Sequence, residues 1–296
     1  MTFNDNARID SSKTTRSGRR TGLAIGGGGG LLVVGVFIVS QLLGVDLTGL
    51  LGGGLGGGAG TEQPGGAIEN CETGADANAR IDCRMAGAAD VLDRYWAENA
   101  PELGFTYSSP EFDLFSGGVD TGCGSATSAV GPFYCPADAN IYLDTAFFED
   151  LEARFGAEDG PFAQMYIVAH EWGHHIQSIT GINSGLDLRD TGPGSDSVRL
   201  EIQADCFAGA WVGEATTVVD DSGTTFLKPI TQAQIDSALS AAAAVGDDHI
   251  QESTSGQVQP ETWTHGSSEQ RQSWFMRGFN GGPNACNAFE LNEDEL

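Results

Sequence analysis

Basic residues are scarce in this sequence. Its 296 residues include 14 lysines and arginines against 41 aspartates and glutamates, which gives a formal net charge of -27. Such an acidic surface repels phosphate backbones and anionic headgroups, because like charges repel. We therefore expect no nucleic-acid partner. The basic residues are also unevenly placed: residues 1–20 carry five of them against two aspartates, a local charge of +3 that leaves -30 for the rest.

Cysteine is absent from the first 70 residues, and six cysteines follow. Six cysteines allow 15 disulfide connectivities, and a sequence cannot choose among them. Two short spacings suggest two local loops and leave one long-range link, which gives the pairs Cys71–Cys83, Cys123–Cys135 and Cys206–Cys286. The alternative is six reduced, buried thiols, which a cytosolic location would favour.

Charged residues are absent from residues 21–45, which contain the apolar run LLVVGVFIVSQLL. A helix of this length, at about 1.5 Å per residue, extends roughly 37 Å and could cross a hydrocarbon core of about 30 Å. Five basic residues precede the segment and none follows within twenty residues. The positive-inside rule then places the N-terminus in the cytoplasm and the C-terminal domain outside. We predict a cell-membrane protein with a single transmembrane helix.

The same segment has a second interpretation as a cleaved signal peptide. No A-x-A site directly follows the apolar run, so an uncleaved anchor is favoured. Residues 46–66 contain ten glycines in 21 positions, which is typical of a flexible linker. The predicted organisation is a basic cytoplasmic tail at 1–20, a transmembrane helix at 21–45, this linker, and one folded domain at 67–296.

The C-terminal domain has the pattern of mixed, helix-rich structure. Pro161 favours a helix start, and the apolar pattern continues from there to a stop at Gly181. A second helix is predicted to begin near Asp196 or Ser197 and to cover SVRLEIQADCFAGAWVGEA. NIYLD, at 140–144, is a short strand candidate.

Histidine is rare, which makes its placement informative. Three of the five histidines stand in HEWGHHIQSITG, residues 170–181. On the predicted helix, His170 and His174 are four residues apart and project from one face, where one metal ion can bind both imidazoles. Glu171 is adjacent to the first histidine and can reach a water molecule on that metal. This is the HExxH arrangement of zinc hydrolases.

Catalytic zinc usually has three protein ligands and one open position for water. The pattern HExxHxxGxxH is excluded, because Gln177 and Thr180 stand where it needs glycine and histidine. Glu201 and Asp205 are four residues apart on the second helix, with apolar residues around them. We predict Glu201 as the third ligand and Asp205 as the acceptor of a ligating histidine's far N–H. A solvated acidic face is the alternative. His175 points about 100° around the helix and is predicted to pack or to support a ligand rather than to bind the metal itself.

Three separated motifs resemble those of a known family. HEWGHHIQ, LEIQADCFAGAW and THGSSEQRQSWFMRGF, preceded by GPFYCPADANIYLD, are similar to the bacterial neutral zinc metallopeptidases, membrane-anchored proteins with one N-terminal span. The resemblance covers about residues 67–290. It implies an α+β fold: a helix-rich, zincin-like metallopeptidase domain with a small sheet, preceded by a single transmembrane helix. It also implies the gluzincin layout, in which the first acid of an E-x-x-x-D segment binds zinc.

The resemblance implies a mechanism for peptide hydrolysis. His170, His174 and Glu201 would hold one Zn²⁺ ion, and Glu171 would accept the proton of a water molecule as general base. The expected partner is a peptide or protein substrate, together with the membrane through the N-terminal helix.

The transition-state oxyanion also needs a hydrogen-bond donor. His265 is the candidate, with Arg271 and Tyr142 as weaker ones, although a capping or surface role would equally explain His265. The strand at 140–144 could pair with the substrate backbone at a sheet edge, as in other gluzincins.

Two other functions compete with a peptidase. One is a different zinc amide hydrolase, such as a deformylase-like enzyme that binds zinc through a cysteine, for which Cys206 is the nearest candidate. A disulfide at Cys206 would exclude it. The other is a non-proteolytic envelope binding or scaffold protein with a structural metal site. Such a site has no need of Glu171, so the presence of this glutamate favours the peptidase.

Overall fold

The computed structural model describes residues 2–17, 66–157 and 160–296. Within these residues, a five-stranded sheet has the order β2-β1-β3-β7-β6. The three central strands run parallel, β1 with β3 and β3 with β7, whereas the outer strands β2 and β6 run antiparallel to their neighbours. The bounds are β1 Thr14–Arg16, β2 Gly66–Ala67, β3 Glu111–Phe115, β6 Phe133–Cys135 and β7 Asn140–Asp144.

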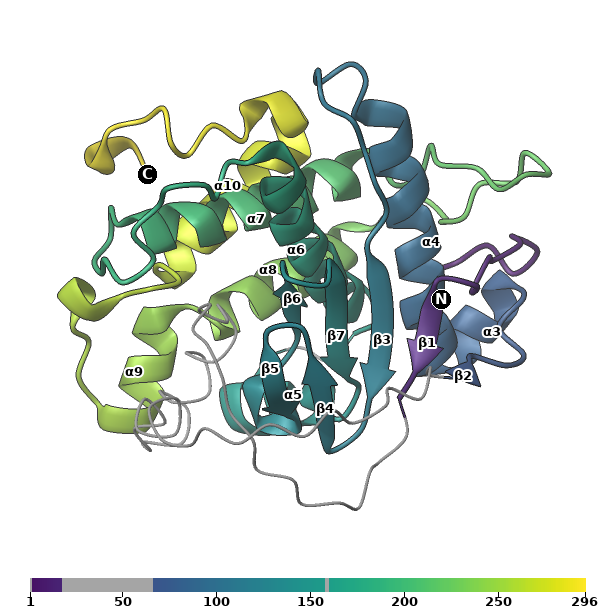
Figure 1. The fold of residues 1–296 in the computed structure, drawn as a ribbon, viewed down its shortest axis with the longest axis horizontal. Coiled ribbons are helices and arrows are strands. Elements are labelled where there is room, and N and C mark those ends of the chain that lie inside the picture. The colour runs from purple at the N-terminus through teal and green to yellow at the C-terminus, as the bar shows by residue number, and fades with distance from the viewer. Residues whose placement is uncertain (1, 18–65, 158–159) are drawn as a thin grey trace.

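The other elements of the described residues are mostly helices. A two-stranded hairpin stands apart from the main sheet and consists of β4 (Gly118–Thr121) and β5 (Gly124–Thr127). Figure 1 shows β6 and β2 at opposite ends of the sheet, with the C-terminal helices gathered beyond β6. The helices are α3 Gly74–Ala79, α4 Ile81–Asn99, α5 Phe147–Phe155, α6 Pro161–Thr180, α7 Asp196–Glu214, α8 Gln232–Ala244, α9 Asp247–Ser255 and α10 Ser268–Gly281. The predicted α+β, helix-rich character with a small sheet is confirmed.

Local sequence signals set the ends of the two central helices. Pro161 occupies the first turn of α6, and Gly181 ends it in the left-handed conformation with φ 75°. Ser195 caps α7 by accepting from the backbone N–H of Val198. Both helices begin where the sequence predicts, because these signals act within one turn. The strand predicted at 140–144 is also confirmed as β7.

Glycines allow α6 and α7 to cross at close range. A Cβ atom on Gly173 would lie 2.9 Å from Cα of Ala204 on α7, closer than real Cβ atoms approach. The contact between α7 and α10 is tighter still, since a Cβ on Gly209 would lie 1.9 Å from the carbonyl oxygen of Phe275. These crossings bring α6, α7 and α10 together around the site described below.

Residues 2–17, expected to form a separate tail, lie within the folded domain. The side chain of Phe3 is fully buried in the hydrophobic core. Strand β1 lies between β2 and β3, and Figure 1 shows it beside β3 at the end of the sheet remote from β6. Asp113 of β3 accepts from both the backbone N–H and the hydroxyl of Ser17, which fastens the end of this segment.

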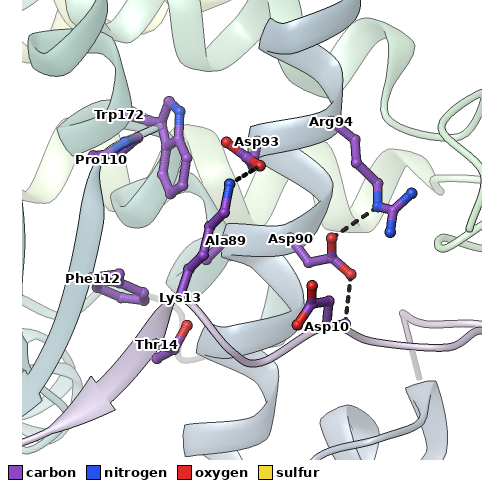
Figure 2. A pocket seen from close by; sticks show the side chains of 10 residues that line it. All are labelled: Asp10, Lys13, Thr14, Ala89, Asp90, Asp93, Arg94, Pro110, Phe112 and Trp172. Carbon is purple, nitrogen blue, oxygen red and sulfur yellow. Dashed lines mark hydrogen bonds and ion pairs between the residues drawn. The ribbon is translucent and has the colours of Figure 1, made fainter. Parts of the chain in front are cut away.

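Ion pairs join this N-terminal segment to α4. Lys13 Nζ lies 2.6 Å from a carboxylate oxygen of Asp93, and the backbone N–H of Asp10 donates to Asp90 at 2.8 Å. Figure 2 shows these contacts beside Arg94, around a small pocket of about 110 Å³. The local positive charge at the N-terminus therefore pairs with the acidic domain.

The predicted single-pass topology is wrong. Arg16 and Gly66 are paired in adjacent strands, whereas a single span between them would separate them by the bilayer core of about 30 Å. None of the helices in the described ranges is long and apolar enough to cross a membrane. The predicted transmembrane segment 21–45 and the predicted linker up to residue 65 lie outside the described residues. The predicted cell-membrane location, with a cytoplasmic N-terminus and a single span, is wrong for the same reasons.

All six cysteines form disulfides in the predicted pairs. Two bridges close short loops with a sequence separation of 12, and the third links α7 to the C-terminal segment with a separation of 80. The pairs are Cys71–Cys83, Cys123–Cys135 and Cys206–Cys286. The alternative of six reduced thiols is excluded in this structure.

Candidate metal centre

Helices α6 and α7 bring two histidines and one glutamate to a common point. The ligand atoms of His170, His174 and Glu201 all lie within 4.8 Å of one another. Nε2 of His170 is 3.3 Å from Oε2 of Glu201, and Nε2 of His174 is 3.5 Å from Oε1. All three side chains are buried. Residues four apart on α6 thus meet a single residue of α7, as the sequence predicts.

This group fits a divalent metal ion. Oε1 of Glu201 is buried and has no hydrogen-bond partner, which is costly for a carboxylate unless a cation occupies the space beside it. Both histidines use Nδ1 for other contacts, so both Nε2 atoms remain for the ion. Two imidazoles and one carboxylate are a common donor set for catalytic zinc. A second cluster of possible ligands contains Cys71 and Cys83, whose sulfurs are already joined in a disulfide.

Charged residues surround Nδ1 of His170. It lies 2.8 Å from Oδ1 of Asp205, which also accepts from the hydroxyl of Tyr166. Arg271 of α10 donates to both oxygens of Asp205, at 2.7 and 3.0 Å. Because a carboxylate only accepts, Nδ1 of His170 carries a hydrogen, and Nε2 is the nitrogen whose lone pair a metal ion would use in place of a proton. Asp205 therefore lies where the sequence predicts, against the far nitrogen of a histidine.

The protonation of this cluster depends on its charges. Burial disfavours a charged imidazole, but Asp205 and Glu201 raise the pKa of His170 to about 10. Burial would raise the pKa of Glu201, but the nearby His174, His265 and His170 lower it below its usual range. Without a cation the cluster holds a proton, and a metal ion competes with that proton for the same atoms.

Glu171 lies in the same cleft as these three residues. Its side chain is 8% exposed, and the backbone N–H of Tyr134 in β6 interacts with its carboxylate. Burial raises the pKa of Glu171 above its usual value, and the charge of Glu201 adds to this effect. A carboxylate in such a site is a stronger base than one in solvent.

His265 also faces the cleft, from the segment between α9 and α10. Its Nδ1 lies 3.3 Å from Asp247, whose other oxygen accepts from the backbone N–H groups of Thr264, His265 and Gly266. These contacts leave Nε2 of His265 for a ligand. Burial would lower the pKa of His265, but the carboxylates of Glu201 and Asp247 raise it above its ordinary value.

The cleft has a volume of about 570 Å³. Its walls come from β6 and the segment after it, from α6 and α7, and from the loop that joins these helices. The residues are Pro132, Phe133, Tyr134, Pro136, Ala137, His170, Glu171, His174, Gln177, Ser178, Asn183, Leu186, Asp187, Leu188, Arg189, Leu200, Glu201 and His265. Apolar side chains form much of this wall. Most of the ionisable groups are on the two helices, whereas Asp187 and Arg189 are on the joining loop and His265 precedes α10.

Several expected residues lie elsewhere. Arg271 and Tyr142 are not among the described residues that line the cleft; Arg271 pairs with Asp205, and the hydroxyl of Tyr142 donates to Asp138. His175 is buried and contacts the hydroxyl of Tyr134, so it packs as predicted. Strand β7 is flanked by β3 and β6 and is not a sheet edge. The sheet edge near the cleft is β6. The sequence of one strand does not show whether a further strand pairs with it, so the outermost strand could not be predicted.

Three contributors to the site were not found from the sequence. Tyr134 and Asp247 come from other parts of the chain, and nothing local connects them with the histidines. Gln177 could have been found, because it lies three residues after His174 and therefore on the same helix face. In the linear motif, the position of Gln177 serves only to exclude a longer histidine pattern.

The fold and the site together define a helix-rich domain with a cluster of possible metal ligands at a helix crossing. The chain belongs to the family described as "Putative neutral zinc metallopeptidase", whose sequence pattern matches residues 3–289. The family name implies zinc as the metal, and the cluster could bind it.

Particular relatives match over most of their length. The uncharacterized protein Rv2575 of Mycobacterium tuberculosis is 48% identical over 300 positions, which cover 98% of each chain. The uncharacterized protein YpfJ of Escherichia coli (strain K12) is 39% identical over 272 positions, 89% of this chain and 87% of its own. No solved structure matches the chain significantly.

Proposed function

We propose that this protein is a metallopeptidase that hydrolyses peptide bonds in peptide or protein substrates, with one zinc ion held by His170, His174 and Glu201. The observation that carries the proposal is that these three residues and Glu171 share one buried corner of a cleft. Zinc bound there would supply a Lewis acid that lowers the pKa of water to about 7.

Glu171 is the general base in this proposal. It accepts the proton of the attacking water molecule and delivers it to the amine of the departing product. Its burial and raised pKa suit both steps, because the group must take a proton and then give it up. The contact with the backbone of Tyr134 holds the carboxylate at the wall of the cleft.

His265 stabilises the negative charge that develops on the substrate carbonyl oxygen. In the charged imidazolium, which the carboxylates of Glu201 and Asp247 favour, Nδ1 faces Asp247 and the Nε2–H is available as a donor. Preorganised donors of this kind are effective because they need not reorient as the charge forms. Asp247 fixes the ring and is therefore a positioning residue.

The substrate backbone pairs with the outer edge of β6. This strand is at the end of the sheet, and Phe133 and Tyr134 line the cleft. An extended peptide added to a sheet edge gains main-chain hydrogen bonds that do not depend on its sequence. It would then pass next to Glu171.

A deformylase-like zinc site is not supported. Its cysteine ligand would have to be Cys206, which is bonded to Cys286. No observation favours a structural metal site over a catalytic one, and cleavage by a Glu171→Gln variant distinguishes the two.

The test is a Glu171→Gln variant of the full chain. We expect it to retain zinc while casein or peptide-library cleavage falls by about 10²-fold or more, since a general base contributes about 10²–10⁴-fold. Glu149→Gln, at an exposed position of α5, is the matched control and should cleave like the parent. Glu201→Ala should lose zinc on dialysis.

Each outcome separates two functions. Unchanged cleavage by the Glu171→Gln variant would remove this residue from the mechanism. A parent protein that binds zinc but cleaves no peptide would instead favour the scaffold alternative. Retention of zinc by Glu201→Ala would show that the ligand set is wrong.

A further inference from the structure

The second histidine of the candidate metal site is oriented by amides. Nδ1 of His174 lies 2.9 Å from Oε1 of Gln177, one turn further along α6. Nδ1 of His170, in contrast, lies against the carboxylate of Asp205. The two imidazoles therefore face the metal position with different supports behind them.

Gln177 begins a chain of hydrogen bonds that leads away from the site. Its Nε2 donates to the carbonyl of Leu200 at 2.7 Å and to Oε1 of Gln203 at 3.1 Å. Nε2 of Gln203 donates in turn to the carbonyl of Cys286 at 2.7 Å. Both glutamines are buried, at 1% and 4% exposed. The chain ends beside the disulfide that joins Cys286 to Cys206 on α7.

Two backbone carbonyls fix the direction of this chain. A carbonyl only accepts, so Leu200 requires the NH₂ group of Gln177, and Cys286 requires the NH₂ group of Gln203. A flipped amide at either position would set two oxygens against each other. The oxygen of Gln177 is thereby left facing His174, whose Nδ1 must carry the hydrogen. Nε2 of His174, which faces Glu201, then has its lone pair free.

We propose that Gln177 and Gln203 are positioning residues for metal binding, which hold His174 as its Nδ1–H tautomer and aim the Nε2 lone pair at the ion. The carbonyl of Cys286 is the fixed end of the chain. The inference rests on the proposed function in one respect, that His174 is a zinc ligand. Neutral amides set the tautomer without adding another negative charge to a cluster that already contains Glu201 and Asp205.

The first test compares zinc affinities of full-length variants by competition with a chromophoric chelator. Gln177→Met and Gln203→Met keep the approximate volume and remove both amide functions. Loss of a group that orients a ligand typically weakens metal binding by about 10- to 100-fold, and we expect this for both variants. Gln164→Met is the matched control, because Gln164 is a buried glutamine of α6 whose amide oxygen accepts from Arg84. It should stay within about twofold of the parent.

The second test reads the tautomer directly in the unsubstituted protein. Nitrogen-15 NMR of the histidine side chains, recorded with and without zinc, should show Nδ1 of His174 protonated in both states. An Nδ1 of His174 that lacks the hydrogen in either state would overturn the inference even where the methionine variants fail to fold. Thermal unfolding of each variant identifies such failures.

The outcomes distinguish a failure of this inference from a failure of the proposed function. Absence of zinc binding by the parent protein overturns both. Zinc binding by the parent, with equal affinities for Gln177→Met and Gln164→Met, overturns only the positioning role. A weakened Gln177→Met variant that melts near the parent temperature supports it.

Discussion

Single residues at this site work in pairs that lie far apart in the chain. His170 depends on Asp205, which Arg271 holds in its charged form by two hydrogen bonds. Because Arg271 is 2% exposed, its own charge has little water around it and needs Asp205 equally. Removal of either member would leave an uncompensated buried charge, which is strongly destabilising. The pair therefore supports the fold as well as the histidine.

Asp247 gives a prediction with a pH readout. Its carboxylate raises the pKa of His265, against the opposing effect of burial. Cleavage should fall as pH rises through that pKa, because His265 then loses its charge. Asp247→Asn removes a group that raises the pKa, so the alkaline limb of kcat/KM should move to lower pH. The maximum should fall by about 10-fold, less than the 10²–10³-fold for loss of an oxyanion donor itself.

The neighbouring aspartate provides the control for this pH profile. Asp248 contacts the backbone N–H and hydroxyl of Ser268 and not His265. Asp248→Asn removes the same charge at the start of α9 and should leave the alkaline limb in place. An unshifted limb in Asp247→Asn would mean that this carboxylate does not act on the ionisation that limits cleavage.

Among the elements, the crossing of α6 and α7 determines whether the three ligands meet. His170 and His174 are on one helix and Glu201 is on the other, so their distances follow the helix separation. Gly173 lies between the two histidines in sequence and faces Ala204 across the crossing. The glycine of HEWGHH thus allows the two helices to pack closely, which the motif alone does not reveal.

Gly173→Ala should therefore weaken zinc binding. The added Cβ would lie 2.9 Å from Cα and 3.0 Å from the carbonyl oxygen of Ala204, both parts of a rigid helix, so the helices must separate. We expect unfolding to become easier by about 1–3 kcal/mol from overpacking, partly offset by about 1 kcal/mol from the better helix propensity of alanine. Zinc affinity, measured by chelator competition, should fall by about 10-fold.

Gly181→Ala separates this effect from a general loss of stability. Gly181 ends α6 with φ 75°, where alanine is strained, and among the described residues no atom that could clash lies within 4 Å of its Cβ position. That variant should unfold more easily while its zinc affinity stays the same. Equal zinc affinities for the two glycine variants would show that the helix separation does not control the ligands.

The N-terminal strand shows how an element can depend on distant residues. TTR at 14–16 is polar and only three residues long, so its two threonines favour an extended backbone without predicting a strand by themselves. It becomes one because β3 on one side and β2 on the other provide pairing partners, and because Asp82 pairs with Arg16 at 2.7 Å. The charge pattern of the sequence predicts a role in membrane topology for these basic residues, whereas Lys13 and Arg16 form ion pairs in the structure.

For the whole molecule, the long-range disulfide is the largest covalent constraint. Cys206–Cys286 closes a loop with a separation of 80 residues, against 12 for Cys71–Cys83. In the loop-entropy model these separations correspond to about 4.5 and about 2.8 kcal/mol. The double variant Cys206→Ala/Cys286→Ala should therefore lose more unfolding free energy in urea than Cys71→Ala/Cys83→Ala, by about 1–2 kcal/mol.

The second double variant is the control, because it removes the same number of buried sulfur atoms. Equal losses for the two variants would argue that native-state packing, and not loop length, sets the contribution of these bridges. The Cys206–Cys286 variant should also retain zinc less well than the Cys71–Cys83 variant, since it frees the carbonyl that ends the amide chain.

The sequence by itself determined the local parts of this protein. Pro161 and Gly181 set the ends of α6, and a spacing of four placed His170 with His174 on one face. The same spacing placed Glu201 with Asp205. These features depend on helix geometry over a few residues, so a linear pattern suffices to find them.

Only the tertiary structure decided which distant groups meet. It placed Gln203 behind Gln177, Tyr134 against Glu171 and Asp247 against His265, and it paired Arg16 with Gly66. The composition of a segment indicates whether it is stabilised by apolar or by oppositely charged neighbours. Many segments of one chain could provide such neighbours, so composition does not identify the contact. Helix crossings and strand pairing determine which segments are in contact, because they position all the residues of an element at once.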